Sequence, residues 1–498
     1  MKTRPRLLAL TLLAMASPAS AQQQEVPAAL SLQEAVEIAR TTNPGFLQTR
    51  NDEALADWDV KQSYGQLLPT ANASGGLSWQ GPGEQQFAPG LTLGDLGFAD
   101  QPSYYGSSYG LNLGYQLDWA TLNGPNQAKA QRTATIGGIA AAEANLIAQV
   151  TTAYVNVLRQ DDAVRISQQQ LENAEFNLRL AQGQLEVGQV TPIDVGQAEV
   201  QVGRARVTLL QTQNGATTSR MRLLQLLGLP VDQPFEPSTV FEFSEPEWDL
   251  GLLNQMALGG NPELLRRRYS TDAADANVSS AWSAYLPSLS LFTGWSGFTR
   301  EASSVEGQIV QAQSRVTGAI SQCVATNDLY SRLANPLPPL DCGSIAFTDQ
   351  QRRQIEQANS QFPFDFVQSP FRLSMTVSVP IFQGLSRQRN LEAAKLQLND
   401  FQQQVREQEL AVRADLAIEV ENTRTLYQSA LLEEQNRQLA EQQLNLARER
   451  YQLGAITFVE LVDAQTVFIQ ADADRTRAIF AYHDSVTTLE ALVGASLR

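Results

Sequence analysis

The sequence predicts an α+β membrane protein made of two internal repeats, each with two transmembrane β-strands and long coiled-coil-like helices. Three observations lead to this fold class. Short motifs recur in the same order in both halves, four segments alternate apolar with polar residues, and two stretches of 66 and 69 residues contain no proline. Together they indicate a repeated strand–helix unit rather than a single globular core.

The duplication is visible in matched motifs. Asn43-Pro44 recurs as Asn261-Pro262, 218 residues later, whereas Gly188 recurs as Gly454, 266 residues later. The larger offset indicates an insertion in the second half. We therefore expect a first repeat over residues 22–250, a second repeat over 251–498 and, within the second, a long extracellular loop over 299–370.

The N-terminus has the pattern of a secretory signal peptide. Lys2, Arg4 and Arg6 precede a short apolar run, and Ala19-Ser20-Ala21 supplies the small residues of a cleavage site. We expect residues 1–21 to be removed on export.

Composition excludes several classes of function. The formal net charge is -16, and nucleic-acid binding needs clustered Lys and Arg rather than excess acid. The chain has one histidine, His483, and two cysteines, Cys323 and Cys342, which an exported protein would by default join in a disulfide. A His/Cys metal site or a Cys-His nucleophile pair is therefore nearly excluded, and we expect no metal, no cofactor and no catalysis.

Four segments are predicted to be strands, at about 69–80, 108–119, 287–298 and 371–382. Each alternates apolar and polar residues, the pattern of a sheet with one face of each kind. An ordinary half-buried hairpin is the alternative for any one of them. Their lengths match the ~9–11 residues needed to cross a bilayer, and their aromatic ends match a membrane girdle, so we favour transmembrane strands.

Four transmembrane strands cannot form a complete channel by themselves, because the smallest single-chain membrane barrels have about eight. An open sheet edge in lipid leaves backbone groups without hydrogen-bond partners, at a cost of several kcal/mol each. If the strands cross the outer membrane, the chain must associate with copies of itself and contact the lipid.

Two long helices are predicted at about 126–187 and 385–453, each followed by a return helix at 192–227 or 458–493. At about 1.5 Å per residue, each long helix would reach roughly 100 Å. Apolar residues of the second helix recur at steps of three and four, which is typical of coiled-coil packing. A plain coiled-coil protein is the alternative, which the strands disfavour.

The turn between each long helix and its return helix has the same chemistry in both repeats. A glycine suits the left-handed position that ends the first helix, a threonine suits the N-cap of the second, and an acid follows at the capping-box position. Helix capping is therefore the first explanation for both acids. The residues are Gly188, Thr191 and Asp194 in the first repeat and Gly454, Thr457 and Glu460 in the second.

Several segments, in order, carry a resemblance to a known family: LSLQEAVEIARTTNPGF, YLPSLSL, VSVPIFQGLSRQRNLEAA, YQLGAITFVELVDAQ and LEALVGASL. Over residues 29–498 the chain resembles the TolC family of outer-membrane efflux and secretion channels. The resemblance implies a homotrimer with a 12-stranded β-barrel in the cell outer membrane and an α-helical barrel in the periplasm. It implies a passive exit duct, not an enzyme, that docks to a periplasmic adaptor (membrane fusion protein) and an inner-membrane pump in a tripartite efflux or type I secretion system.

The resemblance also assigns residues of a periplasmic gate. It places Glu460 and Asp463 at two acidic positions of the constriction and Tyr451 at the constriction tyrosine. Asp194 and Gln197 occupy the matching positions of the first repeat. In a trimer the carboxylates would ring a narrow pore, and acidic rings favour cations over anions. A solvated helix face is the alternative for Asp463.

The sequence departs from the family pattern at Ile456, where the prototype has an arginine that helps lock the closed state. We therefore expect a gate that is held differently or more loosely. The tips of the helical hairpins are also expected to contact the adaptor. These tip residues are Val187, Gly188, Gln189, Val190 and Thr191 in the first repeat and Leu453, Gly454, Ala455, Ile456 and Thr457 in the second.

Three other functions are open to the sequence. A periplasmic adaptor and a secreted coiled-coil structural protein share the long helices, and a secreted hydrolase could use pairs of acids. The hydrolase is the weakest of these, because no pattern indicates a compact pocket. The sequence does not identify the exported substrate, nor whether the pump serves drug, metal or protein export.

Overall fold

The computed structural model describes residues 27–83, 86–88, 91–92, 102–241, 243–246 and 248–497. The expected signal peptide, residues 1–21, lies outside the described residues. The chain forms two compact units. A helical unit comprises Met1–Trp58, Lys129–Asp275 and Lys395–Arg498, and a strand unit comprises Asp59–Ala128 and Ala276–Ala394.

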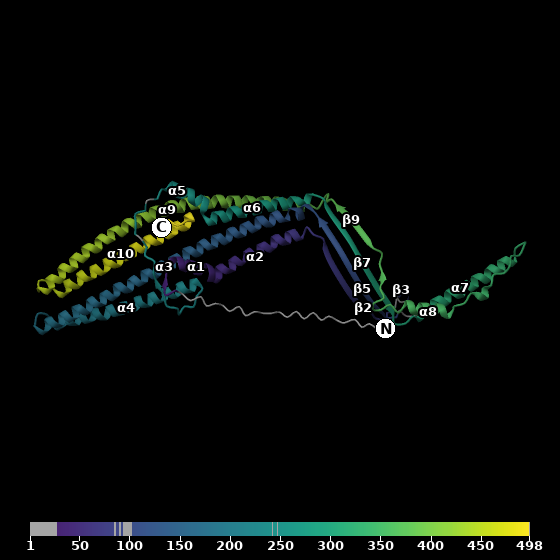
Figure 1. Ribbon diagram of the computed structural model, residues 1–498, viewed down its shortest axis with the longest axis horizontal. Coiled ribbons are helices and arrows are strands. Elements are labelled where there is room, and N and C mark those ends of the chain that lie inside the picture. The colour runs from purple at the N-terminus through teal and green to yellow at the C-terminus, as the bar shows by residue number, and fades with distance from the viewer. Residues whose placement is uncertain are drawn as a thin grey trace. The chain divides into compact units, whose positions relative to one another are not determined.

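The main sheet of the strand unit contains five antiparallel strands, four longer ones and the two-residue β8 (Val367–Gln368) (Figure 1). β2 (Thr70–Gln80) pairs with β5 (Tyr104–Leu117), β5 pairs with β7 (Ser288–Ala302), and β7 pairs with β9 (Arg372–Ser378). β5 belongs to the first repeat and β7 to the second. The two repeats therefore contribute to one sheet and do not form separate ones.

The strand ends differ from those predicted. β5 begins at Tyr104 rather than 108 and ends at Leu117 rather than 119, and β7 continues to Ala302 rather than 298. The added ends pair with each other, since Tyr104 lies opposite Ala302. β9 ends at Ser378 rather than 382, because Pro380 lacks the N–H that a strand ladder needs.

One face of the sheet is apolar and the other is polar. The registers place Ala73 opposite Leu111 and Leu111 opposite Trp295, so the odd-numbered residues share the apolar face. The end of the insertion covers part of this face, where Phe366 meets Tyr109 edge to face with 4.8 Å between ring centroids. The sequence pattern did not indicate this aromatic cover.

The insertion, for which the sequence predicts a long extracellular loop over 299–370, contains helices. α7 (Glu306–Ser331) follows β7, and α8 (Asp349–Ala358) leads back towards the sheet. The α7 segment has apolar residues at helical spacing and no proline, which is enough for a helix. A disulfide between Cys323 and Cys342, whose Cα atoms lie 5.8 Å apart, joins the two arms of the insertion.

Each repeat contains one long helix and one return helix, which lie side by side as a hairpin (Figure 1). α3 (Trp119–Glu186) has 68 residues and α9 (Ser386–Gln452) has 67. The return helices α4 (Pro192–Leu227) and α10 (Phe458–Val493) have 36 residues each and occupy the residues that the sequence predicts for them. These lengths agree with the coiled-coil-like pattern of the sequence.

α3 begins at Trp119 rather than at 126. Asp118 caps it, because its carboxylate accepts a hydrogen bond of 2.7 Å from the backbone N–H of Thr121. Pro125 then lies inside the helix. The absence of proline after 126 was therefore a poor guide to the start of this helix.

A matched joint ends each return helix. In the first repeat, the amide of Asn43 donates a 2.7 Å hydrogen bond to the carbonyl of Leu226, and Gly228 adopts a left-handed φ of 75°. A Cβ atom at Gly228 would lie 2.4 Å from the carbonyl oxygen of Thr42, so only glycine fits. The second repeat has the same joint. The amide of Asn261 donates to the carbonyl of Leu492, and a Cβ atom at Gly494 would meet the carbonyl oxygen of Gly260.

Tyr154 connects α3 to the first strand of the helical unit. Its side chain is fully buried, and its hydroxyl donates to the carbonyl of Leu30 at 2.7 Å. The same oxygen accepts from the backbone N–H groups of Ser238 and Thr239 at 3.0 and 3.1 Å. One phenol therefore satisfies three backbone groups and fixes the segment between the two repeats.

The remaining elements are shorter helices and strands. No helix within the described residues has the length and apolar character needed to span a membrane. The other helices are α1 (Leu32–Thr42), α2 (Pro44–Gly65), α5 (Leu250–Gly260), α6 (Pro262–Trp282) and the short η1 (Ser283–Tyr285) and η2 (Cys342–Ser344). The short strands are β1 (Ala29–Leu30), β3 (Gln86–Ala88), β4 (Leu91–Thr92), β6 (Glu236–Pro237) and β8 (Val367–Gln368).

Candidate functional site

The two hairpin tips have the same turn. Gly188 and Gly454 adopt left-handed φ values of 73° and 69°. The N–H of the residue after each glycine closes the turn, from Gln189 to Gln184 at 2.9 Å and from Ala455 to Arg450 at 2.8 Å. This geometry is the Schellman motif, which satisfies the last carbonyls of a helix.

Asp194 and Glu460 cap the return helices. A carboxylate oxygen of Asp194 accepts hydrogen bonds from the backbone N–H and the hydroxyl of Thr191, at 2.8 and 2.7 Å. These bonds lower the pKa of Asp194. Glu460 accepts the equivalent bonds from Thr457 at 2.8 and 3.2 Å. Both acids therefore have a structural function in helix capping.

Asp463 and Gln197 differ from the capping acids. Both side chains are exposed on the first turns of α10 and α4. The side chain of Asp463 makes no hydrogen bond or ion pair within the part of the chain that the structure describes. Its carboxylate is thus available to an ion or to another chain.

Tyr451 lies in the packing between the hairpins. Only 3% of the residue is exposed, and its ring lies 6.0 Å from that of Phe458, centroid to centroid. Burial, together with the negative charge of Asp194, raises the pKa of Tyr451. Ile456 packs against the same cluster. The position where an arginine was expected is therefore part of an apolar contact.

This tip cluster joins the two hairpins. Its buried members come from both long helices and both return helices. They are Ala181, Ala198, Leu444, Ala447, Tyr451, Phe458 and Leu461. Two polar contacts accompany it: the buried amide of Asn177 donates to Gln465 at 2.6 Å, and Arg448 donates to Asn173 at 2.9 Å. Sequence reasoning missed these pairs, because their partners are more than 270 residues apart and no local pattern marks them.

Glu434 joins α9 to α10. Its carboxylate accepts hydrogen bonds from Arg437 at 3.1 Å and Gln438 at 2.9 Å, and it also binds Arg475 of the return helix. Burial opposes ionisation, but these hydrogen bonds and the charge of Arg475 outweigh it and lower the pKa of Glu434 to about 2.

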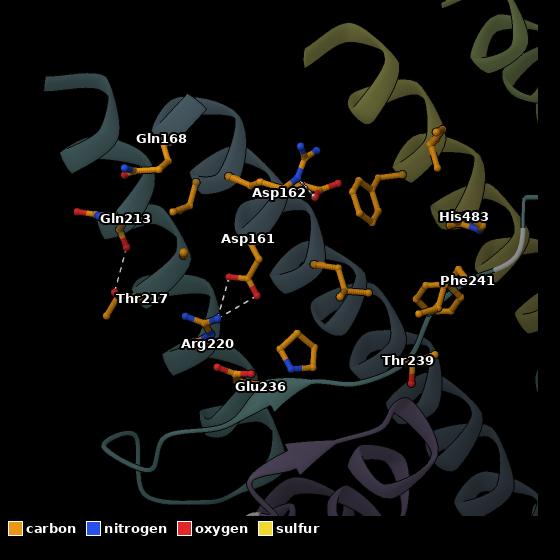
Figure 2. Close-up of a pocket in the computed structure, with 18 residues that line it drawn as sticks. Asp161, Asp162, Gln168, Gln213, Thr217, Arg220, Glu236, Thr239, Phe241 and His483 are labelled. Atoms are coloured by element: carbon orange, nitrogen blue, oxygen red, sulfur yellow. Dashed lines mark hydrogen bonds and ion pairs between the residues drawn. The ribbon is translucent and has the colours of Figure 1, made fainter. Parts of the chain in front are cut away.

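A cavity of about 860 Å³ lies in the helical unit, away from the tips (Figure 2). On one side Asp161 points at Arg220 and forms an ion pair of 3.0 Å. On the other side Phe241 lies beside His483, with 5.2 Å between ring centroids. Burial raises the pKa of Asp161 although Arg220 lowers it. The ion pair ties α3 to α4, which is a structural function.

The described residues contain no group of three or more His, Cys, Asp or Glu side chains that could hold a metal ion. The tips therefore remain the strongest candidate site. They combine a duplicated turn, an exposed acid and exposed apolar residues, of which Val187 is 69% exposed and Leu453 is 83% exposed.

These features define a class of protein with a twice-repeated strand pair and helical hairpin, whose hairpins meet at their tips. The model of the outer membrane efflux protein family matches residues 35–229 and 253–495, and the chain belongs to this family. The resemblance to TolC channels is thereby confirmed. Membership of this transport family also agrees with the prediction that the chain is not an enzyme.

Individual relatives are distant. The chain is 25% identical over 260 residues to the probable outer membrane lipoprotein SilC of Salmonella typhimurium, covering 51% of this chain and 52% of SilC. It is 30% identical over 234 residues to the toluene efflux pump outer membrane protein TtgF of Pseudomonas putida, covering 45% of each. The chain thus spans about half the length of these relatives. The cation efflux system protein CusC of Escherichia coli O157:H7 matches over 465 residues at 22% identity, covering 89% of this chain and 80% of CusC.

Solved structures share the fold over nearly the whole chain. A crystal structure of CusC matches with a TM-score of 0.68 and 18% identity, covering 96% of each chain. The outer membrane protein VceC of Vibrio cholerae matches with a TM-score of 0.66 and 15% identity, covering 94% of this chain and 97% of VceC. At these identities the likeness establishes the α+β fold of this class of channel.

Proposed function

We propose that this chain is the outer-membrane exit channel of a tripartite efflux system. The observation that carries the proposal is the sheet, whose two edges are open and whose apolar face is largely exposed. Within the described residues, β2 pairs only with β5, and β9 pairs only with β7. In lipid, neighbouring copies must cover these edges, because unpaired backbone groups there cost several kcal/mol each.

The exposed side chains of the apolar face support insertion into lipid. Leu77 is 77% exposed and Trp79 is 65% exposed, and each has an odd number, as do most of the apolar residues of β5, β7 and β9. A lipid-facing band ending in aromatic residues suits a membrane sheet. Three copies would supply 12 strands, with the polar faces turned towards a common lumen.

The hairpin tips would then form the periplasmic end of the channel. Asp463 would supply a carboxylate from each copy to the constriction, with Glu460 beside it and Tyr451 as packing behind it. Ile456 would hold the tips through the apolar tip cluster instead of through an ion pair. The exposed turns at 187–191 and 453–457 would contact a periplasmic adaptor, which links the channel to an inner-membrane pump.

The names of relatives do not define one substrate. CusC is named for cation efflux, OpmQ of Pseudomonas aeruginosa for pyoverdine export, and TtgF for toluene efflux. The proposal at this level is therefore an efflux channel without a specified cargo.

Conductance in planar lipid bilayers tests the proposal. The detergent-extracted oligomer should give discrete channel currents. Glu460→Gln combined with Asp463→Asn should lower the preference for cations by at least about twofold, because it removes two negative charges per copy from the constriction. The matched control, Asp349→Asn with Glu356→Gln on α8, should leave the preference unchanged. Absence of any current from the unmodified oligomer would contradict the proposal that the chain forms a channel. Equal effects of the two double variants would contradict only the assignment of Glu460 and Asp463 to the constriction.

A further inference from the structure

The polar face of the sheet carries an unusual charge distribution. Within β2, β5, β7 and β9 the charged residues are Arg300, Glu301 and Arg372. Arg300 lies opposite Gly106, and Arg372 lies opposite Gly294. All four of these numbers are even, so both arginines belong to the polar face, whereas Glu301 belongs to the opposite face.

The same face is otherwise neutral. Asn72 lies opposite Asn112, Asn112 lies opposite Gly294, and Ser290 lies opposite Gln116. No carboxylate occurs on the polar face of the four strands, although the whole chain has a net charge of -16. The one acid on these strands, Glu301, accepts a hydrogen bond of 3.1 Å from the backbone N–H of Phe362.

The two arginines keep their positive charge uncompensated. Both side chains are exposed, and neither forms an ion pair within the described part of the chain. The guanidinium carbon of Arg300 lies 3.9 Å from the centroid of the Tyr104 ring. This cation–π contact orients the guanidinium over the ring and leaves its N–H groups free to bind an anion.

Two aromatic side chains accompany the arginines. Phe292 and Phe298 have even numbers and are each 50% exposed on the polar face. Phe298 is two residues from Arg300 on β7, about 6.6 Å along the strand. Phe292 lies opposite Ser374, which makes Arg372 its diagonal neighbour at roughly 7–8 Å. Each arginine thus has an exposed aromatic ring nearby.

We propose that this polar face is an exit path that favours organic anions, in particular compounds with an acidic group attached to an aromatic or other apolar group. Each guanidinium would bind the carboxylate, sulfonate or phosphate of the cargo, and the nearby phenylalanine would contact its apolar part. The inference rests on the proposed function, because the face lines a lumen only when copies of the chain close the sheet.

The charge of this path is opposite to that of the hairpin tips. Glu460 and Asp463 are acidic and would favour cations, so they would mask an anion preference of the sheet. The test therefore uses Glu460→Gln/Asp463→Asn as its starting channel. In a potassium chloride gradient, the reversal potential of this channel reports the ratio of chloride to potassium permeability.

The starting channel should prefer chloride. Adding Arg300→Gln and Arg372→Gln should lower the permeability ratio by at least about threefold, because two positive charges per copy leave the lumen. Arg300→Lys with Arg372→Lys keeps the charge and should retain the preference. The matched control, Arg315→Gln with Arg353→Gln in the helical insertion, removes the same charge from outside the strands and should have no effect.

Organic ions test the aromatic part. Naphthalene-2-sulfonate should block the current of the starting channel transiently, whereas naphthylmethylammonium should not. Phe292→Ala with Phe298→Ala should shorten the blocks by at least about threefold, since the naphthalene ring loses its aromatic contacts. Equal block by the two organic ions would overturn the inference. A chloride preference that Arg300→Gln with Arg372→Gln leaves unchanged would also overturn it. Neither result would contradict the proposed channel. A complete lack of current in the unmodified oligomer would overturn both.

Discussion

At the scale of single residues, the acids of the tips divide by what their oxygens contact. Asp194 and Glu460 each accept two hydrogen bonds from an N-cap threonine, and turning either side chain away would release the first turn of a helix, at about 1 kcal/mol. The side chain of Asp463 caps no helix within the described residues. In the proposed channel, the asymmetry between Asp463 and Gln197, its counterpart in the first repeat, would set the charge of the constriction.

The residue-scale predictions succeeded where the cause is local. The glycine, the threonine and the acid of each turn are recognisable because a helix end and a helix start need those residue types within a few positions. The resemblance assigns Tyr451 to the periplasmic gate, and the structure buries it against Phe458 and the other hairpin. No sequence pattern reveals that burial, because the contacting residues come from different helices.

Glu434 provides a test of charge at this scale. Its pKa is lowered from 4.5 to about 2, so its stabilising effect is complete above pH 4.5 and is lost as the pH falls towards 2. Glu434→Gln should lower stability at pH 7 by about 1 kcal/mol, because its bonds to Arg437 and Arg475 weaken. Thermal unfolding followed by circular dichroism at pH 7 and pH 3 would measure this, and the difference from the unmodified protein should shrink at pH 3.

The control for this test is Glu449→Gln. Glu449 is exposed on the same helix, α9, and its side chain makes no hydrogen bond or ion pair among the described residues. Its replacement should change the unfolding temperature at neither pH. A loss at Glu434 that is the same at pH 7 and pH 3 would show that packing, not ionisation, explains the effect.

At the scale of elements, the joints that end α4 and α10 are the most constrained part of the duplication. Gly494 has a left-handed φ of 75°, and a Cβ atom there would lie 2.4 Å from the carbonyl oxygen of Gly260. Gly494→Ala should therefore destabilise the helical unit by about 2–4 kcal/mol, from backbone strain and steric overlap together. Urea unfolding followed by circular dichroism would measure the loss.

Gly259 offers a matched control in the adjacent helix α5. A Cβ atom at Gly259 would meet nothing within 4 Å, and its φ is not left-handed. Gly259→Ala should leave stability unchanged or raise it by up to about 1 kcal/mol, since alanine favours a helix. Similar losses for the two alanine variants would contradict the joint as the source of strain.

Element limits were predictable only where turn chemistry marks them. The return helices begin after a threonine and end at a glycine, and their predicted limits agree with α4 and α10. The ends of β5 and β7 were not predictable, because they depend on pairing between the two repeats. The sequence analysis predicted no helix in the insertion, where the structure forms α7 and α8.

At the scale of the whole molecule, each repeat depends on the other. The central pairing of the sheet joins β5 of the first repeat to β7 of the second, and the tip cluster draws on both hairpins. The order of elements and the two-sided sheet followed from the sequence, because alternation and repeats are patterns along the chain. The contacts between the repeats could not be predicted in the same way.

The orientation of the sheet in the membrane gives the last prediction. Asn72 and Ala73 are neighbours in β2 but lie on opposite faces, with Ala73 in the row of Leu111 and Trp295. If the apolar face contacts lipid, Ala73→Arg places a charge in the bilayer and should cost up to about 2–4 kcal/mol per copy. Asn72→Arg places the same charge in the lumen and should be tolerated. Extraction from outer membranes, followed by electrophoresis of heated and unheated samples, should then show oligomer for Asn72→Arg and a strong loss for Ala73→Arg. The reverse order of losses would mean that the apolar face lines the interior, and the proposed channel would have to be abandoned.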